Sequence, residues 1–101
     1  MTYSLFYFDE VATDLKEARN WYRNKNKKLE NRFTLAIKET ILKLQKQPTA
    51  YSFRYKNIRV AITPVFPFGI YFYLNNDKKM IVIIAIIHGK RDPEYAKKRL
   101  L

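Results

Sequence analysis

The hydrophobic pattern begins with a short aromatic segment and then changes to helical spacing. Tyr3 to Phe8 is short and rich in aromatic residues, which is typical of a β-strand. Asp9 follows at a position suited to an N-cap. Apolar residues then recur at helical spacing and predict an amphipathic helix from Glu10 to about Arg23. The next five residues, Asn24 to Lys28, favour turns and predict a short link.

A second amphipathic helix follows this link. Its apolar stripe consists of Leu29, Phe33, Ala36, Ile37, Ile41 and Leu44. Pro48 ends the helix, because proline has no amide hydrogen and disfavours helical backbone at the preceding residue. The two helices therefore form a helical hairpin. Trp21 and Tyr22 are expected to pack inside it.

The second half of the chain has the pattern of strands. Strands are predicted at Ile58 to Ile62, at Gly69 to Leu74 and from Met80 onward, with a turn at Asn75 to Lys79 between the last two. The resulting order is β-α-α-β-β-β, followed by a short C-terminal helical tail. This order predicts an α+β fold, a two-helix hairpin on a small, largely antiparallel sheet. We expect residues 1–101 to form one domain.

The last strand is apolar on both sides. Regular alternation would place Ile81, Ile83, Ala85 and Ile87 on one face and Val82, Ile84, Ile86 and His88 on the other. A strand of this kind needs cover on both faces. The helical hairpin can cover only one face. The other requires the tail from Asp92 onward, aromatic residues of neighbouring strands, or another molecule, for example an acidic partner or a second copy in a homodimer.

Composition excludes several classes of site. The chain has no cysteine and a single histidine, so disulfides and a zinc site within one chain are not expected, and neither is a cofactor. The longest apolar run, Met80 to Ile87, is too short to span a bilayer. The N-terminus lacks the basic region of a signal peptide. We expect a cytoplasmic protein without a membrane partner.

The charge balance adds a functional expectation. Twenty Lys and Arg residues against nine Asp and Glu residues give a formal net charge of +11. Such a charge favours a polyanionic or acidic partner. One basic group lies in the first helix and the link after it. A second, which we consider a candidate surface for a target or partner, consists of Lys90, Arg91, Lys97, Lys98 and Arg99.

Three sequence features, taken with the order of elements, resemble a known superfamily. They are the run NRFTLAIKETILKLQKQP from Asn31 to Pro48, the strand FPFGIYFYL from Phe66 to Leu74, and the ending HGKRDPE from His88 to Glu94. Together they resemble the RelE/ParE superfamily of bacterial type II toxins, and the ending is closer to ParE-like members. The resemblance implies the toxin of a plasmid-stabilisation module, silenced by an acidic antitoxin that wraps around it.

The two branches of this superfamily differ in target. RelE-like members cleave mRNA on the ribosome, which requires a general base, a general acid and cations around the reacting phosphate. ParE-like members inhibit DNA gyrase and have no known catalytic residues. If the chain were a nuclease, the resemblance would assign its chemistry to His88, Arg91, Tyr95, Arg59 and Lys56.

Two features favour the ParE-like branch. Gly69 stands near a position where RelE-type nucleases carry an arginine, and HGKRDP followed by an aromatic residue is a ParE-like ending. We therefore expect a gyrase inhibitor without catalytic residues, with His88 in a structural role at its strand end. Asp92 and Pro93 are expected to start the tail helix. The alternatives are a RelE-like nuclease, a plain nucleic-acid-binding domain that lacks the RRM signature, and a decayed toxin that only binds antitoxin.

Overall fold

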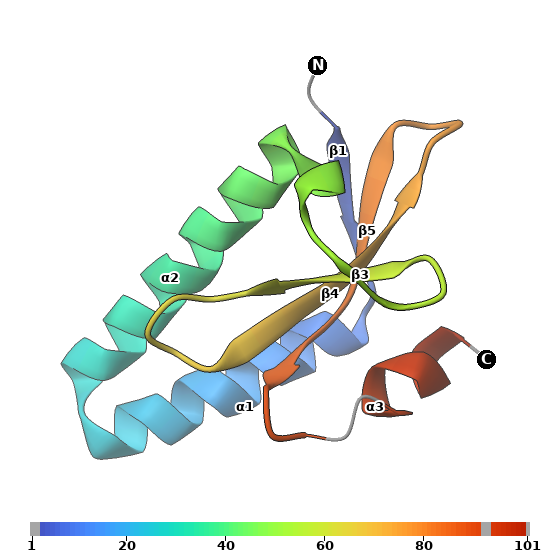
Figure 1. Ribbon diagram of the computed structural model, residues 1–101. Coiled ribbons are helices and arrows are strands. Elements are labelled where there is room, and N and C mark those ends of the chain that lie inside the picture. The colour runs from blue at the N-terminus through green and yellow to red at the C-terminus, as the bar shows by residue number, and fades with distance from the viewer. Residues whose placement is uncertain (1–2, 92–93, 101) are drawn as a thin grey trace.

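Two long helices lie along one face of a five-stranded sheet in the computed structural model, which describes residues 3–91 and 94–100 (Figure 1). The strands are β1 (Ser4–Tyr7), β2 (Phe53–Tyr55), β3 (Ile58–Ile62), β4 (Phe68–Asn75) and β5 (Met80–His88). The α-helices are α1 (Glu10–Lys25), α2 (Lys27–Lys46) and α3 (Glu94–Lys97), and the 3-10 turns are η1 (Pro48–Ala50) and η2 (Lys98–Leu100). Within these residues no helix is long and apolar enough to cross a membrane.

The sheet has the strand order β1-β5-β4-β3-β2. β1 runs parallel to β5, and the other neighbours are antiparallel. The predicted α+β fold with the order β-α-α-β-β-β is confirmed, but the prediction missed the short edge strand β2. β2 has only three residues and lacks a clear alternation of burial, so periodicity could not identify it.

The link between the helices is shorter than predicted. Asn26 is the single residue between α1 and α2, and its side-chain oxygen accepts a hydrogen bond from the Lys28 amide at 2.8 Å. The other residues of the predicted link are helical and lengthen α1 or α2. Asn26 alone, with backbone in the β conformation, caps the start of α2. Asp9 precedes α1 as expected, but its backbone is helical and its side chain makes no capping bond within the described residues.

The helix-side core consists of α1, α2 and the inner face of the sheet. Phe33 and Leu44 of α2 are fully buried there. Tyr22 stacks on Phe33 with a centroid separation of 5.1 Å, as expected for core packing. Arg23 of α1 and Glu30 of α2 form an ion pair at 2.6 Å that joins the two helices near their connection.

β5 contains a bulge that reverses its alternation. Tyr71 of β4 pairs with Ala85, and Phe72 pairs with Ile83, so Ile84 is an extra residue on β5. As a result Ile83 and Ile86 both belong to the helix-side core, while Ala85 belongs to the core on the opposite face. The predicted regular alternation is therefore wrong from Ala85 onward. A bulge leaves no signature in a run that is apolar at every position.

The opposite face of the sheet is covered by residues 94–100, which we call the C-terminal segment (Figure 1). Ala96 of this segment is 1% exposed and packs in a cluster with Ile58, Tyr71 and Ile84. The tail and the aromatic residues of neighbouring strands thus cover the second apolar face of β5. α3 is assigned from Glu94, and the cap expected at Asp92 and Pro93 lies outside the described residues.

Candidate functional site

Two side chains complete the edge of β5 where β1 ends. The last β1 pairing is Tyr7 with Ile83. Beyond it, the Ile86 amide donates to the Asp14 carboxylate at 3.0 Å, and the Ile84 carbonyl accepts from Arg99 at 2.9 Å. Side chains from α1 and the C-terminal segment therefore take over hydrogen bonds that a longer β1 would otherwise make.

Asp14 and Arg99 also pair with each other. Their two hydrogen bonds are both 2.7 Å, in the bidentate arrangement of a guanidinium on a carboxylate. The side chains are only 5% and 9% exposed. Hydrogen bonding to Asp14 raises the pKa of Arg99 above its usual value. Arg99, expected on a target-binding surface, is therefore neutralised inside the protein and anchors the C-terminal segment.

Tyr95 lies between two arginines. The guanidinium carbon of Arg91 is 4.5 Å from the centre of the Tyr95 ring, and that of Arg99 is 4.9 Å away. Both distances are in the range of cation–π attraction. Two of the nuclease candidates, Arg91 and Tyr95, are thus in contact. The tyrosine ring is 40% exposed and links the anchored Arg99 to the exposed end of β5.

His88 ends β5 and is held on two sides. Its ring meets Phe68 edge-on with centroids 5.4 Å apart. Its Nδ1 accepts a hydrogen bond from the Lys90 amide at 3.0 Å. In the neutral ring the proton is then on Nε2. These two contacts fix the orientation of the ring at the end of β5.

A hollow of about 210 Å³ lies beside His88, and we call it the Trp21 hollow. Its lining consists of Asp14, Glu17, Ala18, Trp21, Phe68, Ile86, Ile87, His88 and Arg91. Trp21 is 61% exposed at this hollow, so the expectation of core packing was wrong for this residue. Of its charged residues, Asp14 is paired with Arg99, and Glu17 and Arg91 carry opposite charges, so the hollow has no clear excess of either sign.

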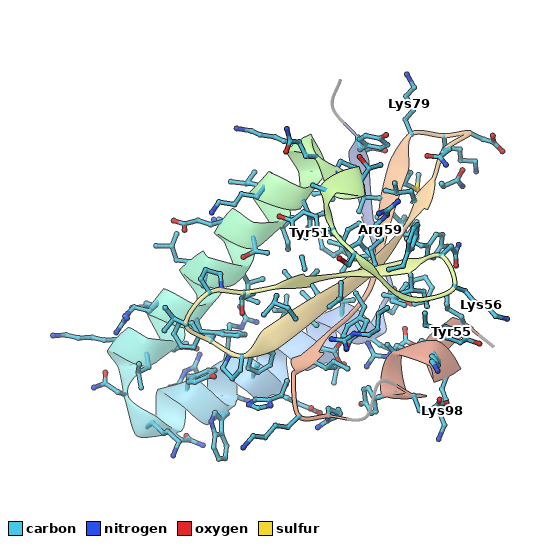
Figure 2. All side chains as sticks on the ribbon, in the orientation of Figure 1. Tyr51, Tyr55, Lys56, Arg59, Lys79 and Lys98 are labelled. Atoms are coloured by element: carbon cyan, nitrogen blue, oxygen red, sulfur yellow. The ribbon has the colours of Figure 1, made fainter. Side chains whose placement is uncertain are left out.

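Lys56 lies in a different place, at the turn between β2 and β3 (Figure 2). Its φ of 48° is left-handed, a conformation that is uncommon for residues other than glycine. A hollow of about 300 Å³, the Lys56 hollow, separates this turn from the C-terminal segment. It is lined by Tyr55, Lys56, Asn57, Ile58, Glu94, Lys97, Lys98 and Leu100.

Arg59 is held away from both hollows. It donates to the Tyr51 carbonyl at 2.6 Å and to the Thr49 carbonyl at 3.3 Å, and its guanidinium carbon lies 3.9 Å from the centre of the Phe53 ring. Figure 2 shows Arg59 beside Tyr51. These contacts tie the loop after α2 to β3.

The nuclease candidates therefore divide between three places. His88 and Arg91 line the Trp21 hollow, Lys56 lines the Lys56 hollow, and Arg59 lies at the loop after α2. Gly69 itself supplies no cation, and a Cβ there would lie 3.0 Å from Val60 Cγ2, so a larger side chain would require its neighbours to shift. Across residues 3–91 and 94–100 there is no group of three or more His, Cys, Asp or Glu residues that could hold a metal ion.

Asp14, the buried partner of Arg99, was not identified as an important residue from the sequence. It lies three residues after Val11 and four before Ala18, and all three are buried. A carboxylate in the apolar stripe of an amphipathic helix is a recognisable signal of a buried charge that needs a partner. The partner itself, 85 residues further along, could not be found by spacing.

The chain is small and basic, with two long helices on one face of a five-stranded sheet. A family described as the ParE toxin of type II toxin–antitoxin system, parDE, matches residues 5–93. Because this match extends over most of the sequence, the chain belongs to the ParE toxin family and is a toxin of the type II toxin–antitoxin class.

Solved structures of this superfamily share the fold. A chain from the chromosomal ParDE toxin–antitoxin system of P. aeruginosa is 20% identical with a TM-score of 0.74, covering 86% of this chain and 96% of that one. A double arginine-to-alanine mutant of the E. coli toxin RelE in the free state is 17% identical with a TM-score of 0.65, covering 100% of both chains. The isolated E. coli RelE toxin is 16% identical with a TM-score of 0.59, covering 98% of this chain and 99% of that one. No curated protein sequence matches this chain.

Proposed function

We propose that this toxin is neutralised by an acidic antitoxin and inhibits DNA gyrase without cleaving nucleic acid. The observation that carries the second part is the separation of Lys56 and Arg59 from the other candidate catalytic residues, His88, Arg91 and Tyr95. Nuclease chemistry requires a general base, a general acid and cations around a single phosphate. Here His88 and Lys56 line different hollows, and Arg59 is engaged with backbone carbonyls.

An apolar groove supports the antitoxin part of the proposal. It lies between β1 and the two long helices, has a volume of about 350 Å³, and is lined by Leu5, Tyr7, Leu15, Arg19, Phe33, Thr34, Ile37, Lys38, Ile41 and Leu42. Arg19 and Lys38 are its charged residues, and both are cations. An amphipathic segment with acidic flanks complements such a groove in shape and charge. The net charge of +11 supports the same class of partner.

The gyrase part is tested with purified protein in two parallel assays. Supercoiling of relaxed plasmid by gyrase should stop as the protein is added. Translating ribosomes programmed with mRNA should give no new cleavage products by primer extension at the same protein concentrations. Ribosome-dependent cleavage with unaffected supercoiling would instead establish the nuclease alternative, for which the contact between Arg91 and Tyr95 is the supporting observation. Inactivity in both assays would identify a decayed toxin.

The antitoxin part is tested by co-expression with the product of a short acidic open reading frame adjacent to this gene. The two proteins should co-purify, and the double variant Arg19→Glu, Lys38→Glu should weaken the complex because it reverses the charge at the groove. Lys46→Glu, an exposed residue of α2 outside the groove, is the matched control. Equal weakening by the control would contradict a specific role for the groove.

A further inference from the structure

Two lysines from distant parts of the sequence lie over the ring of Tyr55, and a third lysine lines the hollow beside it. The Lys97 ammonium lies 3.9 Å from the centre of the Tyr55 ring, and the Lys56 ammonium lies 5.4 Å from it. Lys98 completes the lining of the same hollow, and Figure 2 shows it below Tyr55 and Lys56. The β2–β3 turn and the C-terminal segment thus form one composite cationic surface.

This surface is built by the fold rather than by neighbouring residues in the sequence. The buried pair of Asp14 and Arg99 holds the C-terminal segment at the edge of β5, and Ala96 packs on the sheet face. On the other side of the hollow, the left-handed backbone of Lys56 forms the tip of the hairpin. Left-handed backbone of this kind is typical of tight hairpin turns.

The charge of the hollow is positive after its ion pair is counted. Lys97 donates to the Glu94 carboxylate at 3.1 Å, so these two charges largely compensate each other. Lys56 and Lys98 are both exposed and add two further positive charges. In the Trp21 hollow, in contrast, Asp14 is paired with Arg99 and the charge of Glu17 is offset by that of Arg91, so of the two hollows only the Lys56 hollow has an excess of positive charge.

We propose that the composite surface of Tyr55, Lys56, Lys97 and Lys98 binds the phosphodiester backbone of nucleic acid. Exposed ammonium groups at the rim attract phosphates and release counterions. The tyrosine ring holds the lysine stems in place and is already flanked by cations, so backbone contact is favoured over stacking on a base. This binding goes beyond gyrase inhibition and does not depend on it.

Fluorescence anisotropy with labelled duplex DNA of about two helical turns tests this proposal, with single-stranded RNA of equal length as the second arm. Lys56→Gln and Lys98→Gln should each weaken binding about 3- to 10-fold, and each should lower the slope of log affinity against log salt by about one. Lys46→Gln, an exposed lysine of α2 outside the hollow, should change the affinity less than about twofold, because it contacts no phosphate bound at this surface.

A second variant tests whether the surface is assembled by the buried ion pair. The double variant Asp14→Asn, Arg99→Gln removes both charges together and keeps groups that can hydrogen-bond to the strand edge. It should weaken DNA binding although it does not alter a lysine, and Lys98→Gln should then have less effect in this background than in the parent. Circular dichroism confirms that each variant is folded. If the double variant does not fold, the single-lysine variants still decide the proposal.

Each outcome has a defined meaning. An equal loss of affinity for Lys46→Gln and Lys56→Gln would overturn the proposal, because binding would then follow net charge alone. No measurable binding to either nucleic acid at low salt would overturn it as well. Preference for duplex DNA or for RNA supports the proposal in both cases. RNA preference would weigh against gyrase as the target, and that question is answered separately by the supercoiling assay.

Discussion

Asp14 of α1 and Arg99 of the C-terminal segment form a bidentate ion pair with both contacts at 2.7 Å, although 85 residues separate them in the sequence. Each also bonds the backbone of β5, at the Ile86 amide and the Ile84 carbonyl. The pair therefore joins α1, β5 and the C-terminal segment. It compensates for the shortness of β1 at a buried strand edge.

We predict that the two members of this pair depend on each other for their contribution to stability. Asp14→Ala or Arg99→Ala leaves a charge unpaired in a buried place, which should lower the free energy of unfolding by about 3–5 kcal/mol. The double variant Asp14→Ala, Arg99→Ala should lose less than the sum of the two. Urea unfolding gives these values.

Lys98→Ala is the matched control for this cycle, because Lys98 is exposed in the same segment. We expect it to change the unfolding free energy by less than about 0.5 kcal/mol. Additive losses from Asp14→Ala and Arg99→Ala would contradict the assignment of a coupled pair.

The sequence predicted the elements well and their fine register poorly. Periodicity identified both helices and the three longer strands, because each buries a continuous stripe or face. The bulge at Ile84 could not be predicted, since a strand apolar at every position looks the same in either register. The sequence also could not show which basic residues are buried and which are exposed. Arg99 and Lys98 are neighbours in sequence, but only Arg99 is buried in an ion pair.

Gly69 provides a second prediction, on packing within the sheet. A Cβ at this position would lie 3.0 Å from Val60 Cγ2 and 3.1 Å from Tyr71 Cε1. Gly69→Ala should therefore lower the free energy of unfolding by about 1 kcal/mol, because overpacking outweighs the smaller entropy of the unfolded chain. Gly69→Arg should lower it further and should not create ribosome-dependent cleavage. A more stable alanine variant would show that β3 and β4 can separate without penalty.

Arg23 and Glu30 give a prediction on pH. The hydrogen bond from Arg23 holds the pKa of Glu30 below its usual value. The pair therefore stabilises the fold above the ordinary glutamate pKa of about 4.3, and this contribution disappears as the pH falls through the lowered pKa. The difference in unfolding free energy between the parent and Arg23→Gln should be largest near neutral pH and vanish in acid.

The measurement is urea unfolding at a series of pH values, with Lys16→Gln as an exposed control on α1. Added salt should reduce the neutral-pH difference, because Arg23 is 61% exposed and its charge is accessible to screening. A difference between parent and Arg23→Gln that persists unchanged into acid would show that packing, and not charge, joins the helices.

His88 and Tyr95 are predicted to be dispensable for inhibition of gyrase. His88→Ala and Tyr95→Phe should leave toxicity largely intact where folding survives. His88→Asn should fold best, since an asparagine oxygen can accept the Lys90 amide that Nδ1 accepts here. Growth inhibition and melting temperature are measured together. A loss of toxicity by several decades at unchanged melting temperature would indicate a nuclease, because removal of a general acid or base reduces rates about 10²- to 10⁴-fold.

Arg91 distinguishes the two targets by a single conservative change. Its guanidinium lies 4.5 Å from the Tyr95 ring centre, and its amide donates to the His88 carbonyl at 2.9 Å. A lysine keeps the positive charge and can remain over the ring, but it cannot make a bidentate contact with a phosphate. We therefore expect Arg91→Lys to inhibit supercoiling almost like the parent, and Arg91→Ala to be weaker.

In a nuclease the result would be different, because the guanidinium would have to hold the phosphate as charge develops. Arg91→Lys would then fail almost as completely as Arg91→Ala. Gly69, which supplies no cation near the position where RelE-type nucleases are expected to carry an arginine, is the reason to expect the first result. Growth inhibition, supercoiling and antitoxin affinity should be measured for both variants side by side. A lysine variant that folds and binds antitoxin but has lost toxicity would refute gyrase inhibition as the function of this protein.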